Sequence, residues 1–203
     1  MQEAALNDQS AYHHGTLRRV LLDDAAVLLG EGGQEAVSLR ALARRAGVSP
    51  GAPYRHFADK DALLTALAVE AFVAFGEALA AADAEAEPGR ELEAQAVAYV
   101  RFGLQAPGRF RLMFGNERPV ADDALVLAKQ NAFGVLQARV DRIARAEDDS
   151  RAQAVGFWSL AHGLTVLFLD GRVRDELDGT DDEIIQRVAR ATLRSRDTDR
   201  TDG

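Results

Sequence analysis

The chain has 203 residues, of which 47% are hydrophobic and 28% charged, so its composition is that of a globular protein with one large or two small domains. It contains no cysteine, which excludes disulfides, a thiol nucleophile and thiolate metal sites, and favours a reducing compartment. The net charge of −8, taken alone, argues against a nucleic-acid partner. The N-terminus lacks a signal-peptide pattern, and the longest apolar stretch, residues 154–169, is shorter than the roughly 18 residues of a membrane span, so we expect a soluble protein without membrane contact.

Almost every segment has the apolar spacing of a helix, and none alternates as a strand does. Leu, Val and Ala recur three and four residues apart over residues 14–29, which predicts a first helix that the glycine-rich residues 30–33 end. Ser38 is a typical N-cap for a second helix, and Gly47 ends that helix after two turns.

Two further caps follow within a few residues. Ser49 before Pro50 predicts a third, short helix that reaches about residue 57. Asp59 predicts the start of a fourth helix, which is long, rich in alanine and ends near residue 84.

The rest of the chain predicts five more helices, at about residues 90–105, 107–114, 121–146, 150–170 and 180–195. Ser150 with Gln153, and Thr180 with Glu183, have the spacing of capping boxes that open the last two. The helix at 150–170 is apolar nearly all round, so we expect it to be buried on two sides. Residues 196–203 are charged or small and are expected to fray.

Basic and acidic residues are distributed unevenly along the chain. Residues 1–60 hold seven of each, whereas residues 61–203 hold 17 basic and 25 acidic residues, so the whole negative balance lies in the second part. Residues 38–60 alone carry five basic residues and one acidic residue. A locally basic segment on an acidic body is typical of a DNA-reading domain, although a solvated helix face explains the charges equally well.

Residues 38–57 have the spacing of a helix-turn-helix, in which two short helices are joined by a turn that contains glycine. Ala43 leaves room for the two helices to cross closely, and Gly47 supplies the left-handed backbone of the turn. Leu42 and Phe57 can pack the pair onto the first helix. Five side chains are then left to meet a phosphate backbone, namely Arg44, Arg45, Tyr54, Arg55 and His56.

Residues 14–72 resemble the DNA-binding domain of TetR-type transcriptional regulators. The resemblance rests on the leucine-rich first helix, the Gly-Glu-Gly-Gly break, Ser-Leu-Arg-Ala-Leu-Ala from Ser38, Ala-Gly-Val-Ser from Ala46 and Gly-Ala-Pro-Tyr-Arg-His-Phe from Gly51. The Tyr-x-His-Phe-x-x-Lys arrangement that ends at Lys60 is far more specific than a bare helix-turn-helix.

This resemblance implies a role for individual side chains. Tyr54, His56 and Lys60 would contact phosphates. Ser38 would do so from the start of the second helix, and Arg40 would reach a base edge. The full set of DNA-binding residues that it implies is Ser38, Arg40, Ser49, Gly51, Ala52, Tyr54, Arg55, His56 and Lys60.

The sequence departs from the family pattern at two positions. Ala52 stands where many relatives have Thr or Ser, and Pro53 where they have Leu. Ala52 has no hydroxyl to hold a phosphate, so Arg55, which can grip guanine through two hydrogen bonds, becomes the stronger candidate for base reading. Tyr54 could instead serve only to plug the third and fourth helices together.

Trp158 and His162 lie four residues apart on one predicted helix face and are followed by Gly163. This pattern resembles the C-terminal regulatory domain of a TetR subgroup known for a Trp and His-Gly (WHG) signature. The residues that could line a ligand pocket between helices are Phe102, Phe110, Met113, Phe114, Phe133, Trp158 and His162. Ordinary core packing would explain each of them as well, and no Ser-His-acid pattern makes His162 a catalytic base.

The last two predicted helices have the features of a dimer interface. The first is too apolar to face water, and the second carries an apolar stripe opposite its arginines. The residues that we expect at this interface are Gly156, Ser159, Gly163, Ile184, Val188 and Ala191. Packing of both helices within one chain is the alternative.

These patterns predict an all-α protein, in which an N-terminal three-helix helix-turn-helix domain (residues 14–74) is joined by a long helix to a C-terminal helical bundle for regulation and dimerisation (residues 75–203). The resemblance implies a cytoplasmic, nucleoid-associated, homodimeric repressor that binds a palindromic double-stranded DNA operator and is released by a small-molecule effector. No catalytic residue, metal or cofactor is expected. An activator or a sensor of a protein partner is the alternative, and a helical small-molecule enzyme is a remote one.

Overall fold

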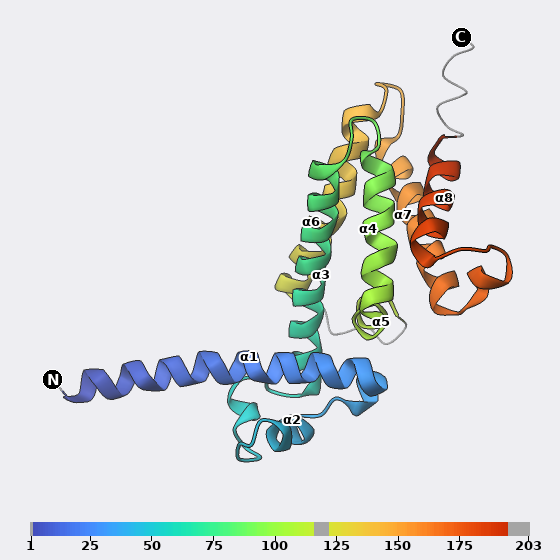
Figure 1. The fold of residues 1–203 in the computed structure, drawn as a ribbon. Helices are drawn as coiled ribbons and strands as arrows, with labels where there is room; N and C mark the ends of the chain where they lie inside the picture. Colours follow the sequence, from blue (N-terminus) through green and yellow to red (C-terminus); the bar gives the residue numbers. More distant parts are fainter. Residues whose placement is uncertain (1, 116–121, 195–203) are drawn as a thin grey trace, which may run out of the picture. The chain divides into compact units, whose positions relative to one another are not determined.

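The computed structural model describes residues 2–115 and 122–194 of the chain. Within these ranges the chain forms eight α-helices and two short 3-10 turns, without a strand, so the prediction of an all-α fold is confirmed (Figure 1). The predicted fraying of residues 196–203 lies outside the described residues.

The chain divides into two compact units. Unit 1 comprises Met1–Ala71 and Gly108–Leu125, and unit 2 comprises Phe72–Pro107 and Val126–Gly203. The division falls close to the boundary expected at residue 74, but the short helix after residue 107 belongs to the first unit, which the linear reading of the sequence did not predict.

In unit 1, the first helix is longer than predicted. Helix α1 spans Gln2–Ala36, and its helical geometry is interrupted at Gly32 (φ −144°) and Gly33 (φ +67°). The predicted glycine break therefore exists but comes later than residue 29. Upstream of residue 14, the chain carries helix-favouring Ala, Leu, Glu and Gln, which extend the helix toward its N-terminus.

The second helix and its turn form as predicted. Helix α2 spans Leu39–Arg45, and the Ser38 hydroxyl oxygen accepts a hydrogen bond from the Ala41 N–H at 3.2 Å, which confirms the N-cap. Gly47 has φ +66°, the left-handed geometry that the turn requires. Leu42, a residue of α2, is fully buried, so this helix packs into the core of unit 1.

The predicted third α-helix over residues 49–57 is wrong. Only Pro53–Arg55 form a 3-10 turn, η1, and the segment before it is a succession of turns. The reason is Pro53. In an α-helix, the N–H of residue 53 would donate a hydrogen bond to the Ser49 carbonyl, but proline has no N–H. The Ser49 carbonyl accepts instead from the Ala52 N–H at 3.0 Å, one residue earlier.

Helix α3 (Lys60–Glu85) begins where the sequence predicted, because the Asp59 carboxylate accepts from the Ala62 N–H at 2.8 Å. Helix α5 (Pro107–Phe114) packs closely on α1 within unit 1. A Cβ atom on Gly108 would lie 2.6 Å from the Leu29 carbonyl oxygen, so only glycine allows this approach.

We expect Gly108→Ala to lower the free energy of unfolding by about 1–3 kcal/mol, because the added methyl group must push the backbones of α5 and α1 apart. Gly30→Ala is the matched control, since a Cβ there meets nothing within 4 Å and alanine favours the helix. Urea unfolding followed by circular dichroism measures both. Equal stability of Gly108→Ala and the wild type would contradict the packing described above.

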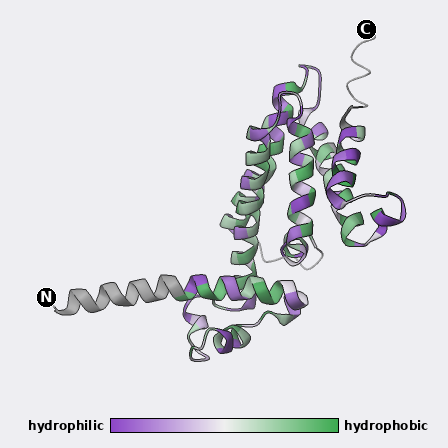
Figure 2. Ribbon diagram, viewed as in Figure 1, coloured by the Kyte–Doolittle hydropathy of each residue, from purple (hydrophilic) through white to green (hydrophobic). Residues whose placement is uncertain are grey.

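Unit 2 is built from the C-terminal part of α3 and four further helices. These are α4 (Glu91–Gln105), α6 (Asp123–Ile143), α7 (Ser150–Leu169) and α8 (Asp181–Arg194), with a 3-10 turn η2 (Arg172–Asp175) between the last two. Figure 2 shows how hydrophobic residues run along these helices. Apolar side chains of α4, α7, η2 and α8 form one buried cluster: Val97, Val100, Phe168, Val173, Ile184, Ile185 and Ala189.

One of the two predicted capping boxes is confirmed. The Thr180 N–H donates to the Glu183 carboxylate at 2.8 Å, and the Glu183 N–H donates to the Thr180 hydroxyl at 3.3 Å. The other prediction is wrong, because α7 is capped by Asp149 rather than Ser150. The Asp149 carboxylate accepts from the Ala152 N–H at 3.0 Å, and an ionised carboxylate is a stronger acceptor than a hydroxyl.

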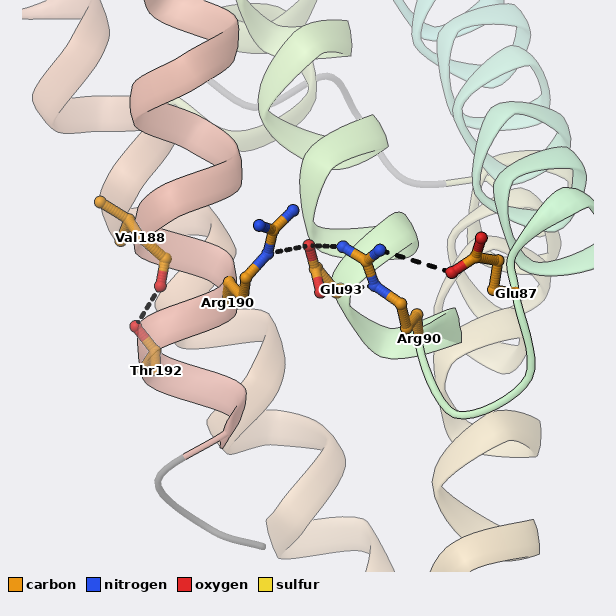
Figure 3. A network of polar contacts seen from close by, with 6 residues as sticks. All are labelled: Glu87, Arg90, Glu93, Val188, Arg190 and Thr192. Carbon is orange, nitrogen blue, oxygen red and sulfur yellow. Dashed lines mark hydrogen bonds and ion pairs between the residues drawn. The ribbon is translucent and has the colours of Figure 1, made fainter. Parts of the chain in front are cut away.

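Ion pairs also tie α4 to α8. Glu93 lies between two arginines, accepting from Arg90 at 2.6 Å and from Arg190 at 3.1 Å (Figure 3). Further along α4, Arg101 donates to Asp182 at 2.8 Å. These contacts bridge the rim of the apolar cluster and fix the register of the two helices.

A second polar cluster joins α3, α6 and α4 and is half-buried. Asp83 accepts from Arg139 through both carboxylate oxygens, at 2.8 and 2.7 Å, and from the Gln95 amide at 2.8 Å. Arg139 also donates to Glu91 at 3.2 Å. The hydrogen bonds from Arg139 are the main reason that the pKa of Asp83 lies below its ordinary value.

We expect Asp83→Asn to lower the free energy of unfolding at pH 7 by about 1–3 kcal/mol, because Arg139 loses the nearer of its two carboxylate partners and keeps only Glu91. Since the folded-state pKa of Asp83 is below the ordinary 3.8, the carboxylate stabilises the fold at higher pH and this stabilisation is lost as pH falls through the folded pKa. The difference between wild type and variant should therefore narrow below about pH 4. Urea unfolding at pH 7 and pH 3 measures this difference, with Asp175→Asn as the control, since Asp175 is exposed and has no ion-pair partner among the described residues.

Two helices, α3 and α7, are long and apolar enough by length and composition to cross a membrane. The most apolar 18-residue segment of α3 is 50% buried within the chain, as in the core helix of a soluble protein. The corresponding segment of α7 is 22% buried. Helix α7 begins before the apolar stretch 154–169, so the length argument made from the sequence does not hold for it.

Candidate functional site

Exposed positive charge gathers on the helix-turn-helix of unit 1. Arg40 and Arg44 lie on α2, Arg55 on η1 and Lys60 at the first residue of α3. The three arginines are exposed and Lys60 is half-buried. Among the described residues none of the four has an ion-pair partner, so their charges are available to an external anion.

The neighbouring basic residues are already used inside the unit. Arg45 donates to Asp24 at 2.7 Å and so ties α2 to α1, which corrects the expectation that it is free for phosphate. Arg19 pairs with Asp23 and Glu70, and Arg18 lies over the Phe57 ring at 5.3 Å. The structure thus separates arginines that hold the unit together from those that face outward.

The polar side chains of the turn differ in how far they reach the surface. Tyr54 is 51% exposed, so it does not act as a plug between the third and fourth elements. Ser49 and Gly51 are exposed, whereas Ala52 and Ser38 are half-buried. His56 is half-buried and its Nε2 atom is covered, so that nitrogen does not face solvent.

Unit 2 contains a cluster of aromatic rings around Trp158 and His162, which pack edge to face at 6.2 Å between ring centroids, as their spacing on α7 predicted. Phe133 of α6 lies 6.0 Å from Trp158. The Tyr99 hydroxyl on α4 is within hydrogen-bonding distance of both Trp158 and His162. The ring centroid of Phe75 lies 4.9 Å from that of Tyr99 and 5.1 Å from that of Phe102. We name these residues the aromatic cluster: Phe75, Tyr99, Phe102, Phe133, Trp158 and His162.

The structure therefore brings four of the seven expected pocket residues into one unit. The other three, Phe110, Met113 and Phe114, lie on α5 in unit 1, where Phe110 and Phe114 pack at 5.0 Å. Sequence reasoning missed Tyr99 and Phe75. No local signal links Tyr99 to Trp158, which lies 59 residues away in the sequence.

The expected dimer residues divide in a similar way. On α7, Ser159 is exposed, and a Cβ at Gly156 or Gly163 would meet nothing within 4 Å. On α8, Ala191 is exposed, but Ile184 is fully buried in the apolar cluster of its own chain. Ile184 is therefore corrected from interface to core, since its stripe faces α4, and Val188 is half-buried against the same cluster.

Helix α7 leaves a large apolar surface uncovered. Its exposed large apolar side chains are Val155, Trp158, Leu160, Val166 and Leu167. We expected this helix to be buried on two sides. Its own chain covers one side and leaves the other exposed. A patch of this kind marks a surface for another molecule.

An all-α chain with an outward-facing cationic helix-turn-helix has the architecture of a DNA-binding transcriptional regulator. Comparisons with known proteins agree. Residues 21–67 match the family model for bacterial regulatory proteins of the tetR family, and residues 92–192 match the tetracyclin repressor-like C-terminal domain. The chain belongs to the TetR family.

Individual relatives extend over most of the chain. A solved protein of unknown function from Rhodococcus sp. RHA1 is 34% identical with a TM-score of 0.79, covering 91% of this chain and 97% of its own. The HTH-type transcriptional repressor KstR of Mycobacterium tuberculosis is 30% identical over 138 residues, which are 68% of this chain and 58% of KstR. A tetR-family regulatory protein from Rhodococcus RHA1, 22% identical with a TM-score of 0.67 over 88% of this chain and 95% of its own, shares the fold.

The protein is thus a DNA-binding regulator and not an enzyme, since its family and the neighbours of its fold are transcription regulators. Regulators of this family are soluble cytoplasmic proteins.

Proposed function

We propose that the protein is a homodimeric, nucleoid-associated repressor that binds a palindromic operator and is released from it by a small-molecule effector. The observation that carries the proposal is a set of four cations on one helix-turn-helix that have no ion-pair partner among the described residues, namely the exposed Arg40, Arg44 and Arg55 and the half-buried Lys60. KstR, a relative, is a repressor, which supports the same sign of regulation.

The DNA contacts that we propose are those of the helix-turn-helix. Lys60 and Tyr54 would hold phosphates, with Ser38, Ser49, Gly51, Ala52 and His56 lining the same surface. Arg40 and Arg55 would read base edges in the major groove. Helix-turn-helix dimers read half-sites about 34–36 Å apart, which requires a twofold axis that the exposed face of α7 can supply.

The effector would bind in unit 2 at the aromatic cluster, whose Trp158 and His162 resemble the signature of the WHG subgroup. Concave sites lined by aromatic side chains and a few polar groups are the usual ligand sites of helical bundles. To release the operator, the effector must bind the DNA-free state more tightly. A coupling of about 3 kcal/mol would change the DNA affinity roughly 150-fold.

The test is binding of the purified protein to DNA from upstream of its own gene, measured by fluorescence anisotropy over a range of salt concentrations. We expect tight binding whose affinity falls steeply with salt. Absence of salt-sensitive binding to that DNA would overturn the proposal. A reporter behind the same promoter, with the gene deleted, distinguishes a repressor from an activator by the sign of the change.

A further inference from the structure

Three polar side chains from α4 and α7 meet inside unit 2. The Trp158 Nε1–H donates to the Tyr99 hydroxyl oxygen at 3.0 Å, and the same oxygen lies 2.9 Å from Nδ1 of His162. Tyr99 is only 5% exposed, so water does not readily compete for these hydrogen bonds. One phenolic oxygen therefore connects the two residues of the Trp and His-Gly signature.

The chemistry of the three groups favours one direction for the second hydrogen bond. An indole N–H can only donate, whereas a phenol has one hydrogen to donate and also accepts. Burial lowers the pKa of His162 below its ordinary 6.5, so its ring is neutral at pH 7 and one ring nitrogen has no proton. If that nitrogen is Nδ1, the hydroxyl accepts from Trp158 and donates to His162, and both contacts are satisfied at once.

We propose that Tyr99 is the positioning residue of the aromatic cluster, whose hydroxyl holds His162 in the tautomer with its proton on Nε2 and holds the Trp158 indole beside it. This inference rests on the proposed function, because the cluster is the proposed effector site. The neutral His162 ring supplies no positive charge to the cluster, whereas Arg151, whose guanidinium lies 4.3 Å from the centroid of the Phe133 ring, does. Tyr99 therefore sets which hydrogen-bonding group His162 can offer an effector, namely an Nε2–H donor.

The wild-type protein can be examined without any effector. Nitrogen-15 NMR of its four histidines, with His162→Gln to assign the signal, reports which ring nitrogen of His162 carries the proton. We expect the Nε2–H form with a pKa below 6.5. Trp158 is the only tryptophan of the chain and lies 6.2 Å from His162, so its fluorescence, which a protonated imidazole quenches, should titrate with the same midpoint.

Tyr99→Phe removes the hydroxyl and keeps the ring. We expect the Nδ1–H form of His162 to appear, because Nδ1 has lost its donor. The fluorescence midpoint should rise by about 0.5–1 pH unit, the size expected for losing one hydrogen bond to the neutral ring. Thr165→Val is the matched control, since it removes another buried hydroxyl, one that donates to the Ala161 carbonyl of the same helix and leaves the cluster intact.

The inference fails if wild-type His162 carries its proton on Nδ1, a result that needs no variant to fold. It also fails if Tyr99→Phe leaves the tautomer and the midpoint of His162 unchanged. Both measurements are made on effector-free protein, so their failure leaves the proposed repressor function standing. If the wild type does not bind operator DNA, the proposed function is overturned, but the measured tautomer of His162 is unaffected.

Discussion

Val155→Glu is expected to convert the protein from a dimer to a monomer and to weaken operator binding by roughly 10²–10⁴-fold. Val155 is 42% exposed on α7 and lies one turn from the exposed Ser159, which we expect at the dimer interface. A glutamate there would place two unpaired carboxylates in the interface of a symmetric dimer. Each monomer would then hold a single half-site without the help of its neighbour.

Val27→Glu is the matched control for this experiment. Val27 is also 42% exposed and also lies on a helix, but on α1, which contributes no residue to the proposed interface. Light scattering should give twice the chain mass for the wild type and the control, and the chain mass for Val155→Glu. A wild-type monomer at micromolar concentration, or a Val155→Glu dimer, would remove α7 as the dimer surface.

Lys60→Ala is expected to weaken binding to all DNA sequences by a similar factor and to flatten the salt dependence. A lysine that neutralises one phosphate contributes about 0.9 to the slope of log affinity against log salt, so its loss from both halves of a dimer lowers the slope by about 2. Tyr54→Ala should also weaken binding without changing sequence preference. The measurement is anisotropy at several salt concentrations on operator and unrelated DNA.

Arg55→Ala should behave differently from Lys60→Ala on the same DNA panel. Loss of a base-reading arginine lowers the binding free energy by about 1–3 kcal/mol at one or two positions of the operator and leaves binding to unrelated DNA nearly unchanged.

The control for Lys60→Ala is Lys129→Ala, which removes the other lysine of the sequence. Its Nζ lies 5.6 Å from the centroid of the Phe72 ring in unit 2. An unchanged salt slope for Lys60→Ala would contradict the proposed phosphate contact.

The features that the sequence predicted well depend on residues close together in the chain. The Ser38 cap, the left-handed Gly47 and the Thr180–Glu183 capping box each involve residues within three or four positions. Their physical chemistry is local, so the residue types alone are sufficient to identify them. The outward-facing Arg40 belongs to the same class, because its place on a short capped helix follows from the same local pattern.

The predictions that failed required either a choice between neighbouring signals or knowledge of distant contacts. Ser49 before Pro50 is a good start for a helix, but Pro53 removes the N–H that would continue it, and the second effect prevails. Arg45 reaches Asp24 from 21 residues away, and Ile184 turns toward α4 rather than outward. No local pattern tells which arginine or which apolar stripe finds a partner in the folded chain.

The two prolines of the turn, Pro50 and Pro53, also affect how this segment meets DNA. Pro50 and Pro53 each fix one backbone φ angle, and Pro53 is buried, so the segment between α2 and α3 has fewer conformations to lose when it is ordered on a duplex. The reading surface of this protein is therefore preorganised, and its association with DNA should proceed as a docking of rigid surfaces with little coupled folding. The restricted backbone of this turn thus lowers the entropic cost of recognition.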